Sequence, residues 1–389
     1  MNSIDIVVIG AGIAGLSAAA ALARHGRVAV LEAEAALGYH SSGRSATFCH
    51  YGIGDATVRG LTTYSRGFFQ DPPSDCAPSP LSRRASALFV ATAGMLDDLE
   101  RLHGDMARFA PGLEWVGESD MRQLFPILKV GEDAVLRGVL DPDGLRLDAD
   151  ALLQSYARQV RAAGGVVQLG QRIASIRRDG AGWRVVGEAG QAWTAPVLVN
   201  AAGAWADGIA VMAGLRPLGL QPKRRTIIML DAPAGADARD WPFLKTAVDD
   251  FYMLPESGRL IASPVDEIAS DPGDAQPEEY DIALAAAKVE EYTDLPVRRI
   301  GRSWAGLRSF VADRVPVAGF APDAPGFFWL AGQGGYGLQT APAMASIVEA
   351  LVTGGSWPIG LAELGVGAEK ILPDRLAVQQ NESASVRQA

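Results

Sequence analysis

DIVVIGAGIAGLSAAAALARHGRVAVLEAE, residues 5–34, is the stretch that decides the fold. Its first part is a continuous apolar, β-branched run, which is typical of a central parallel strand. The small-residue segment that follows predicts a helix ended by Gly26. Residues 27–32 predict a second strand, with Glu32 at its end. A strand, a helix and a strand in this order indicate a βαβ unit.

The glycines between the first strand and the helix have the spacing G-x-G-x-x-G, at Gly10, Gly12 and Gly15. The first permits a tight turn, the second lets backbone amides approach a pyrophosphate, and the third lets the helix pack on the strand. The helix N-terminus then faces the phosphates with its partial positive charge. Glu32 lies about 20 residues further on, where an acid accepts hydrogen bonds from an adenosine ribose. The sequence therefore predicts a dinucleotide site here.

A second match to the spacing occurs at Gly332, Gly334 and Gly337. A strand and a helix flank it, but no further strand with a terminal acid follows, and only about 50 residues remain. We therefore expect this loop to serve the first cofactor, with amides near residues 338–340 directed at an anionic group. A helix start that needs glycine only for packing is the alternative.

Composition limits the function classes. The chain has 389 residues, a formal net charge of −10 and a pI near 5.0, which argues against a nucleic-acid partner. Two cysteines, Cys49 and Cys76, and four scattered histidines predict neither a metal site nor a disulfide framework. The N-terminus resembles neither a signal peptide nor a membrane span, so we expect a cytoplasmic protein without an integral membrane segment.

The rest of the chain predicts an α/β protein, α+β overall, with two domains. A Rossmann-like domain is expected from residues 1–45, 146–214 and 316–370. Residues 46–145 and 215–315, which are richer in Pro, Trp and alternating runs, are expected to form an antiparallel-sheet substrate domain inserted twice. Residues 371–389 are expected to be a disordered tail.

Six motifs together carry a family resemblance: VVIGAGIAGLSAAAALA, GYHSSGRSA, VLVNAAGAWAD, LQPKRR, WAGLRSFVAD and AGQGGYGLQTAP. The chain resembles the FAD-dependent D-amino acid oxidase family, also called the glycine oxidase or DadA-like group. Within it the chain is most similar to bacterial catabolic D-arginine dehydrogenases. The resemblance implies non-covalent FAD and oxidation of an amine by hydride transfer to flavin N5, giving an imine that water hydrolyses to a 2-oxo acid and ammonia.

The resemblance and the fingerprint together assign the residues expected to bind FAD. Those in the loop after Gly38 are expected to wrap the pyrophosphate and approach the flavin, with Arg44 and Ser45 the strongest polar candidates. The expected FAD-binding residues are Gly10, Gly12, Ala14, Gly15, Glu32, Ala33, Ser41, Ser42, Gly43, Arg44, Ser45, Ala46, Ile173, Gly203, Gly332, Gly334, Gly335, Tyr336, Gly337, Leu338, Gln339 and Thr340.

The resemblance also assigns the substrate carboxylate to Arg308, with Arg225 and Tyr252 as further partners. A guanidinium suits this role because its planar fork can hold both carboxylate oxygens. Strand alternation sends Arg224 and Arg225 to opposite faces, and we assign Arg225 to the site. Backbone carbonyls near Gly334 and Gly335 are expected to accept a hydrogen bond from the substrate amine. No dedicated general base is evident.

Departures from the D-arginine pattern predict a different substrate. In the D-arginine dehydrogenases an acid binds the substrate guanidinium, and the matching position in this chain is Ala87. A tyrosine and a histidine that contact substrate in that group are replaced here by Ile53 and Phe48. Because an unpaired cation in a closed pocket is costly, we expect neutral, apolar or aromatic substrates. His50 is expected to line the substrate pocket, although a structural role or a covalent flavin link are alternatives.

Other functions stay open. A 2-hydroxy acid dehydrogenase or a secondary-amine oxidase would use the same carboxylate arginine, and Arg83 and Arg84 could favour a dicarboxylate. A flavin monooxygenase would need a nicotinamide site, and a non-catalytic flavoprotein would have no use for a carboxylate clamp. The electron acceptor, whether dioxygen, a quinone or another protein, has no signature in the sequence.

Overall fold

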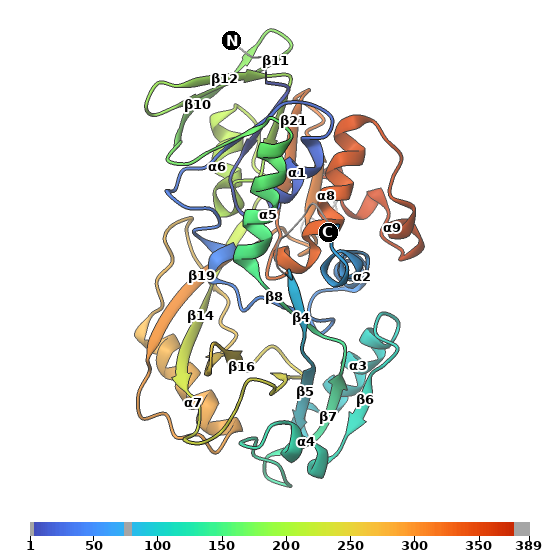
Figure 1. Cartoon of the computed structure of the whole chain (residues 1–389), viewed down its shortest axis with the longest axis vertical. Coiled ribbons are helices and arrows are strands. Elements are labelled where there is room, and N and C mark those ends of the chain that lie inside the picture. Colours follow the sequence, from blue (N-terminus) through green and yellow to red (C-terminus); the bar gives the residue numbers. More distant parts are fainter. Residues whose placement is uncertain (1–3, 74–79, 377–389) are drawn as a thin grey trace, which may run out of the picture.

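Two large sheets organise the chain. The computed structural model describes residues 4–73 and 80–376. One sheet is almost entirely parallel and the other largely antiparallel, and their elements lie towards opposite ends of the long axis (Figure 1). The predicted fold class is confirmed, because a Rossmann-like sheet and a mainly antiparallel sheet occur in one chain.

The parallel sheet has six strands in the order β20-β21-β13-β1-β2-β9. Only β20 runs antiparallel to its neighbour, β21. Strand β1 is central and all four of its residues are buried, as its continuous apolar run predicts. The strands are β1 (Ile6–Ile9), β2 (Val28–Leu31), β9 (Val166–Gln168), β13 (Val197–Asn200), β20 (Val317–Phe320) and β21 (Phe327–Ala331).

The second sheet has the strand order β18-β14-β17-β16-β15-β5-β7-β6, with β19 also paired to β14. Only the β15–β5 pair in it is parallel. The strands are β5 (Ala87–Thr92), β6 (Glu114–Val116), β7 (Val135–Asp141), β14 (Gln221–Asp231), β15 (Phe243–Thr246), β16 (Tyr252–Glu256), β17 (Arg259–Ser263), β18 (Ile268–Ala269) and β19 (Arg302–Phe310).

Two small sheets complete the described strands, one next to the parallel sheet and one between the large sheets (Figure 1). The first contains β10 (Ile173–Asp179), β11 (Gly182–Gly187) and β12 (Ala192–Ala195), joined by antiparallel hairpins. The second contains β3 (Phe48–Cys49), β4 (Ser82–Arg84) and β8 (Leu145–Leu147). The predicted domain boundaries remain a prediction.

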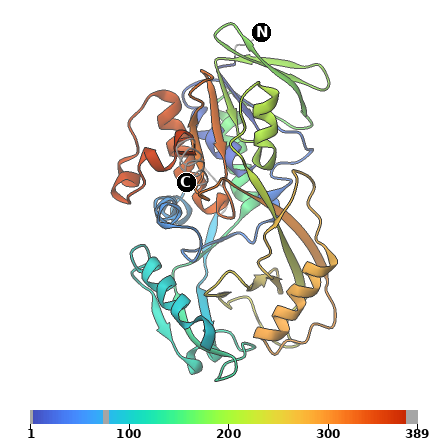
Figure 2. The same cartoon turned by 180° about the vertical axis from the view of Figure 1, so that it is seen from behind.

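The α-helices cover the sheets, and Figure 2 shows the orange helix α7 along the outer side of β14. Helix α4 packs near β7, towards the other side of the second sheet (Figure 1). The helices are α1 (Ile13–Leu22), α2 (Ala56–Gln70), α3 (Leu96–Ala107), α4 (Glu118–Leu124), α5 (Ala149–Ala162), α6 (Ala206–Met212), α7 (Glu279–Tyr292), α8 (Gly337–Thr353) and α9 (Ile359–Glu363).

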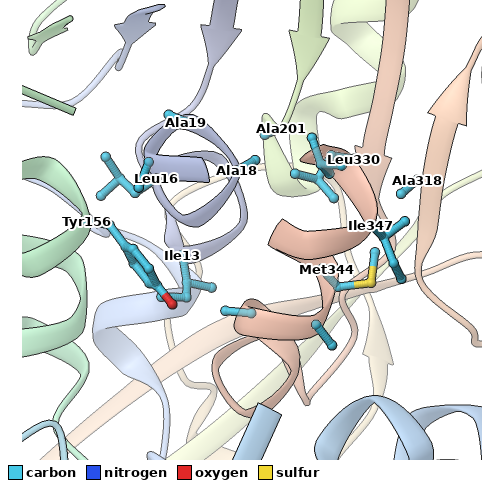
Figure 3. Packing of buried hydrophobic residues seen from close by; sticks show 14 of the residues in the cluster. Ile13, Leu16, Ala18, Ala19, Tyr156, Ala201, Ala318, Leu330, Met344 and Ile347 are labelled. Atoms are coloured by element: carbon cyan, nitrogen blue, oxygen red, sulfur yellow. The ribbon is translucent and has the colours of Figure 1, made fainter. Parts of the chain in front are cut away.

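Helix α1 is the centre of the nucleotide-binding half. It is apolar all round, as expected of a helix buried on nearly all sides. Figure 3 shows Leu16 of α1 beside Tyr156, and Met344 and Ile347 of α8 on the other side of α1, all within one hydrophobic cluster. Close packing of the two helices brings both of their N-termini to the same edge of the parallel sheet.

Three boundaries differ from the sequence prediction. Helix α1 ends at Leu22 rather than at Gly26, and α8 begins at Gly337, whereas the segment APAMASIVEALVTGG, which begins at Ala341, was the expected helix. The prediction of a disordered tail from residue 371 is wrong for residues 371–376. Ile371 is buried, and the Arg375 guanidinium forms an ion pair with Asp313 at 2.8 Å, so the chain stays packed at least to residue 376. Residues 377–389 lie outside the described part of the chain.

Candidate active site

A cavity of about 490 Å³ runs from the carboxyl ends of the parallel strands to one face of the second sheet. Ligands of open α/β sheets bind at this edge because the loops and helix N-termini gather there. The loops after β1, β2, β13 and β21 all contribute to the lining. The dinucleotide fingerprint and the predicted carboxylate clamp therefore open into one cavity.

The three fingerprint glycines have different surroundings. Gly10 has a positive φ of 104°, and a Cβ there would lie 2.5 Å from the carbonyl oxygen of Ala201. A Cβ on Gly15 would lie 2.0 Å from the carbonyl oxygen of Gly10, so this residue is needed for packing and does not line the cavity. Gly12 lines the cavity, and a Cβ there would meet only Ser42 Oγ, at 3.4 Å. This space beside a helix N-terminus fits a pyrophosphate.

Glu32 follows β2 and lines the cavity. Its carboxylate accepts hydrogen bonds from Ala11 N at 2.7 Å and from Glu34 N at 2.9 Å. These bonds fix the carboxylate beside the glycine turn, and each oxygen keeps a further lone pair for a ribose hydroxyl. Ala14, Ala33, Ile173 and Gly203 also lie in the lining, as do Ser41, Ser42, Arg44, Ser45 and Ala46.

The loop after Gly38 joins the cavity to the second sheet. Ser42 Oγ accepts a hydrogen bond from Ile13 N at 3.0 Å, and Ser41 Oγ donates one to Leu307 O at 2.6 Å. The Arg44 guanidinium donates to the carbonyl of Ala305 at 3.1 Å and pairs with Asp274. Arg44 therefore fastens the cofactor loop to the second sheet with its charged end.

The Gly-rich loop after β21 contributes Gly332, Gly334, Gly335 and Gly337, followed by Leu338 and Gln339 of α8, to the lining. This loop belongs to the same parallel sheet as the first fingerprint. The Gln339 amide donates to His50 O at 3.2 Å and to Thr62 Oγ1 at 2.7 Å, so it also fixes the backbone of the substrate pocket.

Arg225 and Arg224 point to opposite faces of β14. Arg224 pairs with Asp281 of α7 at 2.7 Å, whereas Arg225 lines the cavity. Arg225 is buried, and its Nε donates to the carbonyl of Asp266 at 2.8 Å, while its Nη2 has no hydrogen-bond partner among the described residues. Burial and then the charge of Arg308 lower its pKa to about 10, so it stays cationic at neutral pH. Glu267 Oε1 lies 3.5 Å from this nitrogen without forming a hydrogen bond, so Nη2 can still donate one to an anionic ligand.

Arg308 lies on β19, and its guanidinium packs directly on the loop after β21. A Cβ built on Gly335 would lie 2.6 Å from the Arg308 Cζ, so the backbone of this loop sets the position of the guanidinium. Gly334 N donates to Ser309 O at 3.0 Å, which holds the loop against the strand. Arg225, Arg308, Tyr252 and Gly335 all line the cavity.

Aromatic rings form the wall opposite the loop. Phe48 stacks on Phe243 with 4.8 Å between ring centroids, and His50 lies 4.8 Å from the same ring. Tyr252 is 5.6 Å from Phe243 by the same measure. These four residues and Ile53 line the cavity.

His50 is neutral and its tautomer is defined by its surroundings. Burial, and then the positive charge of Lys245, lower its pKa to about 3. Gly52 N donates to His50 Nδ1 at 3.1 Å, so Nδ1 is an acceptor and the proton of the neutral ring is on Nε2. His50 can therefore offer a hydrogen-bond donor to a ligand.

Five residues named from the sequence lie outside the cavity lining: Gly15, Gly43, Tyr336, Thr340 and Ala87. Gly43 is needed for packing, because a Cβ there would lie 2.7 Å from Gly38 O, and Thr340 Oγ1 donates to Tyr336 O at 2.9 Å. Tyr336 packs against Phe310. Ala87 is buried in the same hydrophobic cluster as Phe243, its neighbour across the β5–β15 pair, so aromatic packing covers it. Arg83 and Arg84 also lie outside this lining.

Sequence reasoning missed a charged pair. Lys245 of β15 and Asp249, in the turn that follows, both line the cavity and form an ion pair at 2.8 Å. Burial acts to raise the pKa of Asp249, but the charges of Lys245, Arg225 and Arg308 outweigh it and lower the pKa. A lone lysine in the apolar segment "FLKT" was the available signal. Phe243, His40 and Trp205 are further lining residues that were not named.

Within residues 4–73 and 80–376, no group of three or more His, Cys, Asp or Glu side chains is arranged to hold a metal ion. The helices in these ranges are also too short or too polar for a membrane span. The free thiol of Cys49 is buried, which raises its pKa to about 12 and keeps it protonated. Cys76 lies outside the described residues.

Known proteins resemble this chain in sequence and in fold. The family model described as "FAD dependent oxidoreductase" (DAO) matches residues 5–351. The uncharacterized oxidoreductase YurR of Bacillus subtilis is 26% identical over 374 residues, which cover 90% of this chain and 94% of YurR. Hydrogen cyanide synthase subunit HcnC of Pseudomonas aeruginosa is 23% identical over 68% of this chain, and the match spans only 61% of HcnC. The crystal structure of glycine oxidase from Geobacillus kaustophilus has a TM-score of 0.79 at 21% identity, covering 92% of this chain and 96% of that one.

Proposed function

Because the chain belongs to the FAD dependent oxidoreductase family, we propose that it catalyses the oxidative deamination of D-amino acids to 2-oxo acids and ammonia. FAD is the cofactor, and the residues around Gly12 and Glu32 fit its diphosphate and ribose. The proposal includes a preference for neutral, apolar or aromatic substrates over D-arginine.

The observation that carries the proposal is the shared cavity. A carboxylate clamp of Arg225, Arg308 and Tyr252 and the dinucleotide fingerprint line the same space. Two guanidinium groups and a phenol hydroxyl can hold one carboxylate with charge-assisted hydrogen bonds. Such a clamp beside a redox cofactor suits a substrate that is oxidised at the carbon next to its carboxylate.

The chain's own contribution to the reaction is positioning. Arg308 and Arg225 bind the carboxylate, and the loop at Gly334 and Gly335 offers backbone carbonyls to the amine, which must be neutral to react. FAD supplies the acceptor for the hydride. Orientation of bound reactants supplies most of the rate enhancement available to a site of this kind. Water then hydrolyses the imine product.

Several features of the pocket support the exclusion of D-arginine. Ala87 provides no acid for a substrate guanidinium, and Phe48 and Phe243 fill the wall near it. The cations Arg225, Arg308 and Lys245 would repel a second positive charge on the substrate. A cationic side chain would thus enter the pocket without a free partner.

The names of similar proteins support amine chemistry but do not select one substrate. A glycine oxidase shares the fold. The D configuration and the distinction from D-arginine dehydrogenases rest on the motif resemblance and on the pocket residues. Secondary amines and 2-hydroxy acids carry the same carboxylate and are the competing substrate classes.

The test is anaerobic mixing of the FAD-loaded protein with D- and L-amino acids, secondary amines and 2-hydroxy acids, followed by loss of oxidised-flavin absorbance. We expect rapid bleaching by neutral D-amino acids and poor bleaching by D-arginine. Bleaching by hydroxy acids alone would replace the proposal with a 2-hydroxy acid dehydrogenase. No bleaching by any amine would refute the deamination proposal.

A further inference from the structure

The ion pair of Lys245 and Asp249 lines the cavity but was assigned neither to the FAD-binding residues nor to the carboxylate clamp. Lys245 is 5% exposed although it carries a charge, and it lines the substrate pocket next to Tyr252, its partner across the β15–β16 pair. A lysine this deeply buried is rare and needs partners for its ammonium group. Its presence in the wall of a cavity indicates a function in binding.

The bonds of Lys245 leave room for a ligand. Its Nζ donates to Thr246 O at 3.3 Å and pairs with Asp249 Oδ1 at 2.8 Å. Because an ammonium group has three N–H donors, one remains after these two contacts. Asp249 itself is 65% exposed in its side chain, so it can accept water or move when the pocket is occupied.

The charges at this end of the cavity do not balance. Among the described residues in the lining near the clamp, Arg225, Arg308 and Lys245 are cationic, and Asp249 is the only carboxylate. Glu267 lies 3.5 Å from Arg225 outside the lining, but it is shared with Lys223 and Arg314. Asp266 also lies next to Arg225 outside the lining, and its carboxylate accepts hydrogen bonds from Thr226 N and Thr226 Oγ1. Within the lining near the clamp, one substrate carboxylate leaves one cation more than the acids, and a second acidic group of the ligand would compensate it.

Strand register shows where that second group would lie. Lys245 is directly opposite Tyr252 in the β15–β16 pair, so their side chains share the face that carries Arg225 and Phe243. Tyr252 thus stands between the arginines and the lysine. Asp249 pairs with Lys245, and both residues line the same cavity as Arg225 and Arg308.

We propose that Lys245, together with the Nε2–H of His50 in the same lining, is a second anion-binding point of the substrate pocket, so that an amine carrying two acidic groups is bound more tightly than its neutral analogue. The proposal rests on the proposed amine oxidation for its turnover but not for its binding. It ranks acidic substrates above neutral ones and leaves D-arginine excluded. The second acid could stand on the substrate side chain or on the amine nitrogen.

The binding test uses the oxidised FAD-loaded protein and ligands that cannot be oxidised. Succinate and glutarate are titrated beside their monoamides, succinamate and glutaramate, and the change in flavin absorbance gives each dissociation constant. A carboxylate that gains a charge-assisted bond to Lys245 should bind about tenfold more tightly than its amide or better. Equal binding of acid and amide by the unmodified protein would overturn the proposal.

Variants locate the effect. Lys245→Met should bring the acid-to-amide ratio close to one, Lys245→Arg should keep it, and Asp249→Asn should raise it by removing the competing carboxylate. Lys288→Met is the matched control, because Lys288 pairs with the adjacent Asp250 at 2.8 Å but lies outside the lining. Loss of the ratio in Lys288→Met, or its survival in Lys245→Met, would contradict a direct role of Lys245. Retained FAD and an unchanged melting temperature show that each variant is folded.

Turnover then identifies the position of the second acid. D-aspartate and D-glutamate are compared with D-asparagine and D-glutamine, and N-carboxymethyl-D-alanine is compared with its N-carbamoylmethyl amide, by anaerobic flavin bleaching. A higher kcat/KM for aspartate and glutamate than for their amides places the second acid on the substrate side chain. A higher kcat/KM for the N-carboxymethyl compound than for its amide places it on the amine nitrogen. Neutral D-amino acids that bleach the flavin, together with no preference for acids in either assay, would refute this inference and leave the proposed function intact. A preference for diacids in the binding assay, with no bleaching by any amine, would support this inference and refute the proposed function.

Discussion

Replacing Gly335 by alanine tests whether the loop after β21 sets the position of the substrate-binding arginine. Gly335 lies outside the left-handed backbone region, so alanine is compatible with its conformation. The added Cβ would lie 2.6 Å from Arg308 Cζ, and the guanidinium would have to retreat by about 0.8 Å to reach an ordinary contact of 3.4 Å. The atom that must move is the far end of a flexible side chain, so we expect little loss of stability.

The functional loss should be much larger. A misplacement of about 1 Å at a site that orients its substrate can reduce the rate by about 100-fold. We therefore expect Gly335→Ala to lower the limiting rate of flavin reduction by about 10- to 100-fold and to weaken binding of simple carboxylates. Anaerobic stopped-flow absorbance with a neutral D-amino acid measures the rate, and the flavin spectrum measures FAD content.

The control is Gly104→Ala in α3, where a Cβ would meet no atom within 4 Å. It should leave both the reduction rate and the FAD content unchanged. Arg308→Lys is the complementary change, because it keeps the charge and removes the planar fork. If Gly335→Ala reduces its flavin as fast as the unmodified protein, the loop does not position Arg308. If it loses FAD in proportion to activity, the effect belongs to the cofactor site instead.

Three further changes test other parts of the cavity. Glu32→Ala removes the acceptor of the Ala11 amide and should weaken FAD binding by about 10-fold or more, measured by fluorescence titration of the apoprotein; unchanged affinity would exclude Glu32 from the ribose site. Ala87→Glu places a carboxylate in a fully buried position, and should lower the free energy of unfolding by about 3 kcal/mol or more without creating D-arginine turnover, as urea unfolding and flavin bleaching would show. Because burial and then the charge of Lys245 lower the pKa of His50 to about 3, below its ordinary 6.5, the unfolded chain binds a proton between these values that the native protein does not. The free energy of unfolding should therefore fall as the pH drops from about 6.5 towards 3, and His50→Gln should flatten this dependence between pH 7 and pH 5; an identical slope for both proteins would mean that His50 titrates normally.

The nucleotide-binding half could be predicted from the sequence because the residues that define it lie close together in the chain. A β-branched run, three glycines and a terminal acid occur within residues 5–34, and the structure places them as strand, helix and strand in that order. Strand alternation was also enough to separate Arg224 from Arg225, since neighbouring residues of a strand face opposite sides. The carboxylate clamp itself came from the family resemblance, because its members lie on three separate segments between residues 225 and 308.

The substrate end was less predictable because it depends on contacts between strands distant in the sequence. In the sequence, Lys245 is indistinguishable from a solvent-exposed lysine of a strand. Only the β15–β16 register places it opposite Tyr252. Ala87 was assigned to the pocket by position alone, and only the tertiary packing shows that it lies in the aromatic cluster around Phe243. Arg44 was expected to bind the cofactor, but its guanidinium forms an ion pair with Asp274, which lies on another segment. Side-chain direction in such cases is decided by partners that a local pattern does not contain.

The β15–β16 hairpin concentrates the substrate-facing residues in a very short segment. Phe243, Lys245, Asp249 and Tyr252 all line the cavity and fall within ten consecutive positions, whereas the dinucleotide fingerprint and Arg308 lie on other elements. Exchange of residues 243–249 with the corresponding segment of another family member would therefore replace one wall of the pocket and leave the cofactor cradle untouched. For enzyme engineering, this hairpin can be exchanged as one segment. A combinatorial library confined to it would vary the substrate pocket and leave the residues that bind the flavin unchanged.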